Sequence, residues 1–155
     1  MGNAPDFQKN NNLKMKTDSR TSRIFYQELS KLFYAMAAVD GTIREEELDV
    51  LKKIVKKQWY AIEHTLDEYR TDLVYCILIT FDWLRENQWN MKNVIAQFST
   101  YKKDHEALFT PAVNALILKT SYAIASAFAR RNKSEMVLFS QIEAVLRQKQ
   151  LPAKS

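Results

Sequence analysis

Apolar residues recur at helical spacing along most of the chain from residue 19 onward. Phe25, Leu29, Leu32 and Met36 lie at i, i+4, i+7 and i+11, which places them on one face of a helix over residues 19–39. The same kind of spacing predicts five further helices, over residues 44–60, 66–86, 91–107, 111–128 and 134–149. The pattern therefore predicts an all-α fold, a single-domain bundle of about six helices.

The third predicted helix is apolar on nearly all sides. Its longest apolar run extends from Leu73 to Phe81, about half of the ~20 residues that a membrane-spanning helix needs. A helix that is apolar all round is usually buried. We therefore expect residues 66–86 to form the central helix of the bundle.

Composition supports the helical prediction and bounds the class of protein. The 155 residues include only 2 Gly and 3 Pro, too few for the frequent turns of a β-sandwich or barrel. One cysteine, Cys76, cannot form an internal disulfide, and Met1–Asp6 lacks the basic and apolar start of a secretory signal. The lone cysteine and the missing signal predict a cytoplasmic protein. Residues 1–17 are polar, basic and without an apolar period, so we expect a flexible basic tail there, a domain at 18–150 and a short tail at 151–155.

One stretch, Tyr34-Ala35-Met36-Ala37-Ala38-Val39-Asp40-Gly41-Thr42-Ile43-Arg44-Glu45-Glu46-Glu47-Leu48, combines a small-residue helix end with an acidic helix start. Asp40, Gly41, Ile43 and Glu47 would fit positions 5, 6, 8 and 12 of an EF-hand calcium loop. Positions 1 and 3 would then be Met and Ala, which offer no side-chain oxygen. Two carboxylates cannot supply the six to eight oxygens that Ca²⁺ takes, so this interpretation is rejected.

An Ala-rich helix followed by D-G-x-I and an acidic E-L helix start resembles the repeat of the tellurite-resistance TerB-like family. The resemblance implies a compact helical bundle with two helix–turn–helix halves. It also implies a non-catalytic role in bacterial stress or metal-ion response. That role would be exerted through a protein partner or at the inner face of the membrane.

An internal repeat at a shift of 88 residues supports two pseudo-repeated halves. Tyr34, Ala35, Ala37, Glu47 and Ile54 fall on Tyr122, Ala123, Ala125, Glu135 and Ile142. The second half departs from the family pattern, because Phe128 stands at the place of Asp40 and only Glu135 is kept. If the acidic residues of the family form a shared cation site, half of that site is missing here.

Four carboxylates are the candidate ligands of a divalent cation: Asp40, Glu46, Glu47 and Glu135. Hard cations prefer such oxygens. The alternative is structural, since Asp40 can cap the second helix and Glu47 can stabilise its start. No Gly-rich phosphate loop, H-E-x-x-H, C-x-x-C or G-x-S-x-G motif is present, so we do not expect an enzyme.

Basic residues gather near the C-terminus, where residues 111–155 hold seven Lys or Arg against two acids. The candidate basic patch comprises Arg130, Arg131, Lys133, Arg147 and Lys149. Together with the N-terminal tail it could bind nucleic acid or anionic lipid headgroups. No recognition-helix motif accompanies the patch, which argues against nucleic acid.

Aromatic residues support a third hypothesis, a plain protein-interaction module. Large aromatic side chains are enriched at protein interfaces. Trp59 continues the apolar stripe of the second predicted helix, so we expect it in the core. Trp89 lies in the polar stretch between the third and fourth predicted helices, so we expect it to be the most exposed tryptophan.

Overall fold

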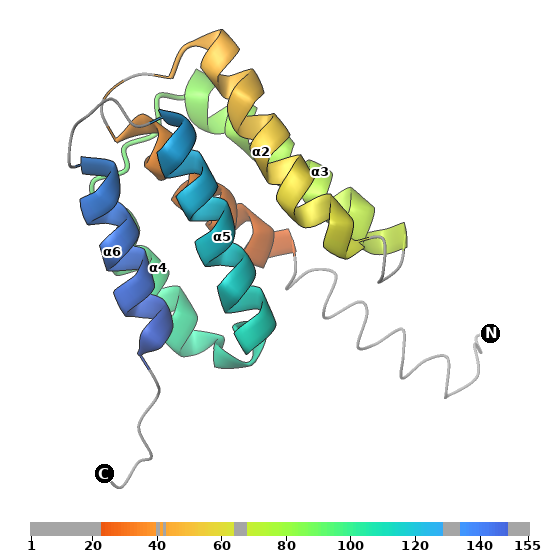
Figure 1. Cartoon of the computed structure of the whole chain (residues 1–155), viewed down its shortest axis with the longest axis vertical. Coiled ribbons are helices and arrows are strands. Elements are labelled where there is room, and N and C mark those ends of the chain that lie inside the picture. Colours follow the sequence, from red (N-terminus) through yellow and green to blue (C-terminus); the bar gives the residue numbers. More distant parts are fainter. Residues whose placement is uncertain (1–22, 40, 42, 64–67, 129–133, 149–155) are drawn as a thin grey trace, which may run out of the picture.

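Six α-helices and a short 3₁₀ helix make up the part of the chain that this computed structural model describes, which is residues 23–39, 41, 43–63, 68–128 and 134–148 (Figure 1). The first helix spans residues 23–38. The others are α2 (Glu45–Glu63), α3 (Glu68–Glu86), α4 (Val94–Asp104), η1 (Glu106–Leu108), α5 (Pro111–Phe128) and α6 (Ser134–Arg147). No strand occurs within these ranges, so the all-α prediction is confirmed.

The helices form a bundle in which α2 packs against α3, and α5 packs against α6. In Figure 1, α2 and α3 lie side by side on one side of the bundle and α4 and α6 on the other, with the first helix and α5 between them. Helix α5 packs against both α2 and α6. The predicted tails at 1–17 and 151–155 and the connection between α5 and α6 (residues 129–133) lie outside the described residues. The predicted pseudo-repeat therefore stays a prediction.

The first helix, and not α3, is the central one. Leu29, Leu32, Phe33, Ala35 and Met36 are all fully buried. Its polar Ser30 is also buried, and the hydroxyl donates to the carbonyl oxygen of Tyr26 at 2.7 Å, so the helix leaves this group satisfied.

The prediction that the third helix is buried on all sides is wrong. Helix α3 buries Val74, Ile77, Phe81 and Leu84, but Tyr75, Ile79 and Trp83 are 45%, 67% and 55% exposed. The burial of a helix depends on how many neighbours surround it, which the apolar pattern of the helix does not contain.

Two polar contacts join distant helices within the core. The indole N–H of Trp59 on α2 donates to the hydroxyl of Thr120 on α5 at 2.9 Å, and both side chains are buried. Lys102 at the end of α4 is also buried, and its ammonium donates to Glu106 at 3.1 Å and to the carbonyl oxygen of Gln148 at 2.8 Å. The charged hydrogen bonds of Lys102 thus hold the end of α6 against the end of α4.

The ends of several helices differ from the prediction. The segment predicted as one helix over 91–107 is α4 and η1, because His105 leaves helical geometry at φ −137° and ψ 46°. Helix α3 ends where Gln88 takes a φ of 47°, which lets the N–H of Trp89 reach back to the carbonyl oxygen of Leu84 at 3.0 Å.

Candidate functional site

The turn that carries the acidic motif connects the first helix to α2. Gly41 has a φ of 143° and its N–H donates to the carbonyl oxygen of Ala38 at 2.9 Å. A Cβ built at this position would have no atom within 4 Å. Glycine is therefore favoured at position 41 by its positive φ, since an added Cβ would meet no neighbouring atom there.

Glu47 works as part of the start of α2. Its Oε1 accepts a hydrogen bond from the backbone N–H of Arg44 at 2.8 Å, and its Oε2 lies 3.5 Å from the Arg44 guanidinium. A carboxylate that accepts a backbone N–H three residues earlier satisfies one of the free donors at a helix start. This geometry matches the structural alternative for Glu47.

Helix α3 holds the same turn from the other side. The Nε of Arg85 donates to the carbonyl oxygen of Ile43 at 2.9 Å, and the Ile43 side chain is buried. The acids that follow, Glu45 and Glu46, are exposed. The turn is thus tied to the core at Ile43 and presents carboxylates to solvent at the first turn of α2.

The predicted cation ligands are only partly within the described residues. Asp40 lies outside them, as does the side chain of Glu135, so their distance from Glu46 and Glu47 is not defined. Within the described ranges, no three His, Cys, Asp or Glu side chains group closely enough to hold a metal ion. The divalent-cation site stays a prediction.

The predicted basic patch has one member in the described part of the chain. Arg147 is exposed and pairs with Glu143 at 2.8 Å on the same helix. The other members, Arg130, Arg131, Lys133 and Lys149, lie outside the described residues. The nucleic-acid or lipid hypothesis for this patch therefore stays a prediction too.

The tryptophans divide differently from the prediction. Trp59 is buried as expected. The prediction for Trp89 is wrong, because this side chain is half-buried and its ring lies edge-on to Tyr34, with centroids 6.4 Å apart. The positive φ of Gln88 turns the chain back at the end of α3 and packs Trp89 against the core. Trp83 is the exposed tryptophan.

Three large apolar side chains form an exposed row on α3. Tyr75, Ile79 and Trp83 lie at i, i+4 and i+8, so successive members are neighbours on one side of the helix. We call this row the α3 ridge. The sequence predicts a helix that is apolar on nearly all sides here, and that pattern does not say which apolar face the neighbouring helices leave uncovered.

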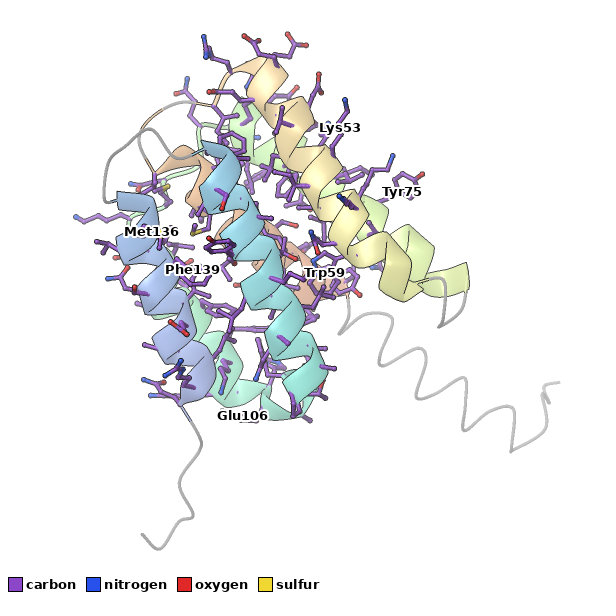
Figure 2. All side chains as sticks on the ribbon, in the orientation of Figure 1. Lys53, Trp59, Tyr75, Glu106, Met136 and Phe139 are labelled. Atoms are coloured by element: carbon purple, nitrogen blue, oxygen red, sulfur yellow. The ribbon has the colours of Figure 1, made fainter. Side chains whose placement is uncertain are left out.

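Lysines lie beside the α3 ridge on the neighbouring helix. Lys53, Lys56 and Lys57 on α2 are exposed and have no ion-pair partner among the described residues. Lys52 differs, because its ammonium contacts Asp82 of α3 at 2.8 Å. Figure 2 shows the labelled Lys53 and Tyr75 projecting from the α2–α3 hairpin on its outer side.

Other surface features are weaker candidates for a functional site. Tyr122, Met136 and Val137 are also exposed, but the ring of Tyr122 packs edge-on against Phe139 at 5.9 Å. An open depression of about 320 Å³ lies between the start of α4 and α6, and Lys92 is the one charged residue that lines it. This lining provides no acid–base pair for catalysis.

None of the helices in the described ranges is both long and apolar enough to cross a membrane. Comparison of the chain with family models, curated proteins and solved structures finds no match. The resemblance to the TerB-like family therefore rests on residues 34–48 and on the 88-residue repeat.

Proposed function

We propose that this protein is a non-catalytic helical interaction module that binds its partner through the α3 ridge. The observation that carries the proposal is the exposure of Tyr75, Ile79 and Trp83 in one continuous row. Exposed apolar residues scattered singly are normal on a protein surface, whereas a contiguous apolar patch usually marks an interaction site.

The contacts of the hairpin support a stable platform for such a site. Helix α3 is held to α2 by the Lys52–Asp82 ion pair and to the acidic turn by the Arg85–Ile43 hydrogen bond. The ridge thus stands on a helix whose opposite face is anchored in the core. We further propose, from the TerB-like resemblance, that the module acts in bacterial stress or metal-ion response.

Photo-cross-linking in cells tests the proposal without assuming the identity of the partner. A benzophenone amino acid replaces Ile79 at the middle of the ridge. The matched control carries it at Val137, which is 54% exposed on α6, compared with 67% for Ile79. Both positions are apolar, helical and exposed, so nonspecific labelling should be similar.

We expect irradiation to give adducts with another molecule from position 79 and few from position 137. Thermal melts check that both variants are folded. Equal labelling from the two positions, or no labelling from position 79, would overturn the assignment of the α3 ridge as the binding surface.

A further inference from the structure

We infer that the partner of the α3 ridge is the surface of a lipid bilayer with anionic headgroups, an inference that rests on the proposed function. The apolar ridge and the neighbouring lysines form one amphipathic surface. It differs from the basic patch near the C-terminus, since it lies on α2 and α3.

The Lys52–Asp82 contact fixes how the two helices are aligned. The two helices run antiparallel as a hairpin (Figure 1), so a step of three residues forward along α2 matches a step of three residues backward along α3. Residue 55 therefore lies at the same level along the hairpin as Ile79. Lys53 and Lys57 therefore lie at the level of the middle of the ridge. Lys56 lies between them, one turn beyond Lys52 on the side of α2 toward α3.

The residue types fit a bilayer interface. Tyr and Trp are enriched at the headgroup level of membranes, where their rings are buried and their polar atoms stay hydrated. Lysine extends an apolar stem and keeps its ammonium near the phosphates. A helix that lies in the plane of the interface presents such an apolar row to the acyl boundary and flanks it with basic residues.

Most of the exposed acids in the described part of the hairpin lie toward one end of it. Asp82 is paired with Lys52. The exposed acids Glu45, Glu46 and Glu86 lie at the end of the hairpin nearest the Gly41 turn. Asp49 is also exposed and lies one helical turn before Lys53, on the side of the lysines that faces this turn. We therefore expect the lysine-bearing part of α2 to lie closer to the anionic surface than the acidic turn.

A second copy of the chain fits the same surface less well. An isologous dimer uses the same surface of both copies. If its two-fold axis passed Ile79 at a right angle to α3, Tyr75 of one copy would contact Trp83 of the other. The same axis would bring Lys53 of one copy opposite Lys57 of the other. Like charges would then meet beside the apolar ridge, which disfavours the dimer.

Vesicle flotation tests the inference with the full chain and two lipid mixtures. One mixture is phosphatidylcholine alone, and the other adds phosphatidylglycerol. We expect binding to the anionic vesicles, weakened by added salt, and little binding to phosphatidylcholine alone. Each lysine near an anionic surface contributes about 1 kcal/mol, or about fivefold in affinity. A triple Lys→Gln variant at positions 53, 56 and 57 should therefore lose about 100-fold.

Variants of the ridge separate insertion from simple charge attraction. Ile79→Glu should abolish flotation, whereas the matched control Val137→Glu should float as the parent does. Trp83 also serves as a reporter, since its emission should shift to the blue when anionic vesicles are added. Trp83→Phe should remove that shift and retain binding.

Absence of binding to anionic vesicles at low salt by a folded parent chain would overturn the lipid inference. Equal loss of binding in Ile79→Glu and Val137→Glu would also overturn it. The proposed function is tested separately by the adducts from position 79. A protein adduct without vesicle binding would support the α3 ridge as the interaction surface and show that its partner is a protein and not a lipid bilayer. A covalent dimer there would assign a second copy.

Discussion

The hydrogen bond between Trp59 and Thr120 joins α2 to α5 inside the core, and its removal tests the packing between them. The exposed fractions of the two side chains are 2% and 0%, so water cannot replace a lost partner. Thr120→Val keeps the shape of the side chain but removes the oxygen that accepts from the indole N–H. The carbonyl oxygen of Leu116, which the Thr120 hydroxyl also contacts, keeps its bond within the helix.

A buried donor that is left without an acceptor costs roughly 1–3 kcal/mol. We therefore expect Thr120→Val to lower the free energy of unfolding by about 2 kcal/mol. In a domain of this length such a loss lowers the melting temperature by roughly 4–8 °C. The m-value of urea unfolding should not change, because the exposed surface on unfolding stays the same.

A double-mutant cycle separates the hydrogen bond from the change in packing. Trp59→Phe removes the indole N–H, so adding Thr120→Val in that background leaves no unsatisfied donor and should cost close to nothing. Urea unfolding followed by far-ultraviolet circular dichroism measures all four proteins. An equal cost of Thr120→Val in the two backgrounds would refute the reasoning, because it would mean that the hydrogen bond carries none of the loss.

Three further predictions concern other parts of the molecule. Lys102→Met should destabilise the protein by about 2 kcal/mol in urea unfolding, because it removes charged hydrogen bonds to Glu106 and Gln148. An unchanged midpoint would contradict this role. Burial, together with the nearby Glu28, raises the pKa of Tyr101 from 10.0 to about 12. The unfolded chain therefore loses this proton first, and stability present below pH 10 is lost as the pH rises from 10 to about 12. Tyr101→Phe should reduce that alkaline loss and should not destabilise at neutral pH, since the buried hydroxyl has no hydrogen-bond partner in the described ranges. Finally, the cation hypothesis predicts that Ca²⁺, Mg²⁺, Mn²⁺ or Zn²⁺ raises the melting temperature relative to EDTA, and that Asp40→Ala abolishes the rise. No rise with any ion would leave Glu47 with its helix-start role alone.

The sequence predicted the helices well because their signals are local. The stripe from Phe25 to Met36 is indeed buried, as are Leu48, Leu51, Val55 and Trp59 of α2. Gly41 indicated the turn before α2 because glycine tolerates a positive φ. The acidic residues after it indicated the start of α2, which Glu47 stabilises. These properties depend on residues a few positions apart, so they can be predicted from the amino-acid sequence without knowledge of the tertiary structure.

The position of each helix in the bundle was not predictable in the same way. Helix α3 and the first helix are both strongly apolar, and only packing decides which one is surrounded. Trp89 was expected to be the most exposed tryptophan, but Trp83 is, for a related reason. The positive φ of Gln88 turns Trp89 back onto Tyr34, and a glutamine in the sequence gives no sign of such a backbone angle.

The candidate site was therefore only partly visible in the sequence. The acidic turn was found, and its Glu47 proves to hold the helix start. The α3 ridge was not identified, because the whole helix over 66–86 was expected to be buried. Its separation from the core became clear only when the neighbouring helices were in place, with α2 contributing the exposed lysines.

Photo-cross-linking from position 79, compared with position 137, tests the central claim most directly. The account predicts abundant adducts from the α3 ridge and few from the exposed apolar residue on α6. Equal labelling at the two positions, or none at position 79, would contradict the claim that the α3 ridge is the surface through which this protein acts.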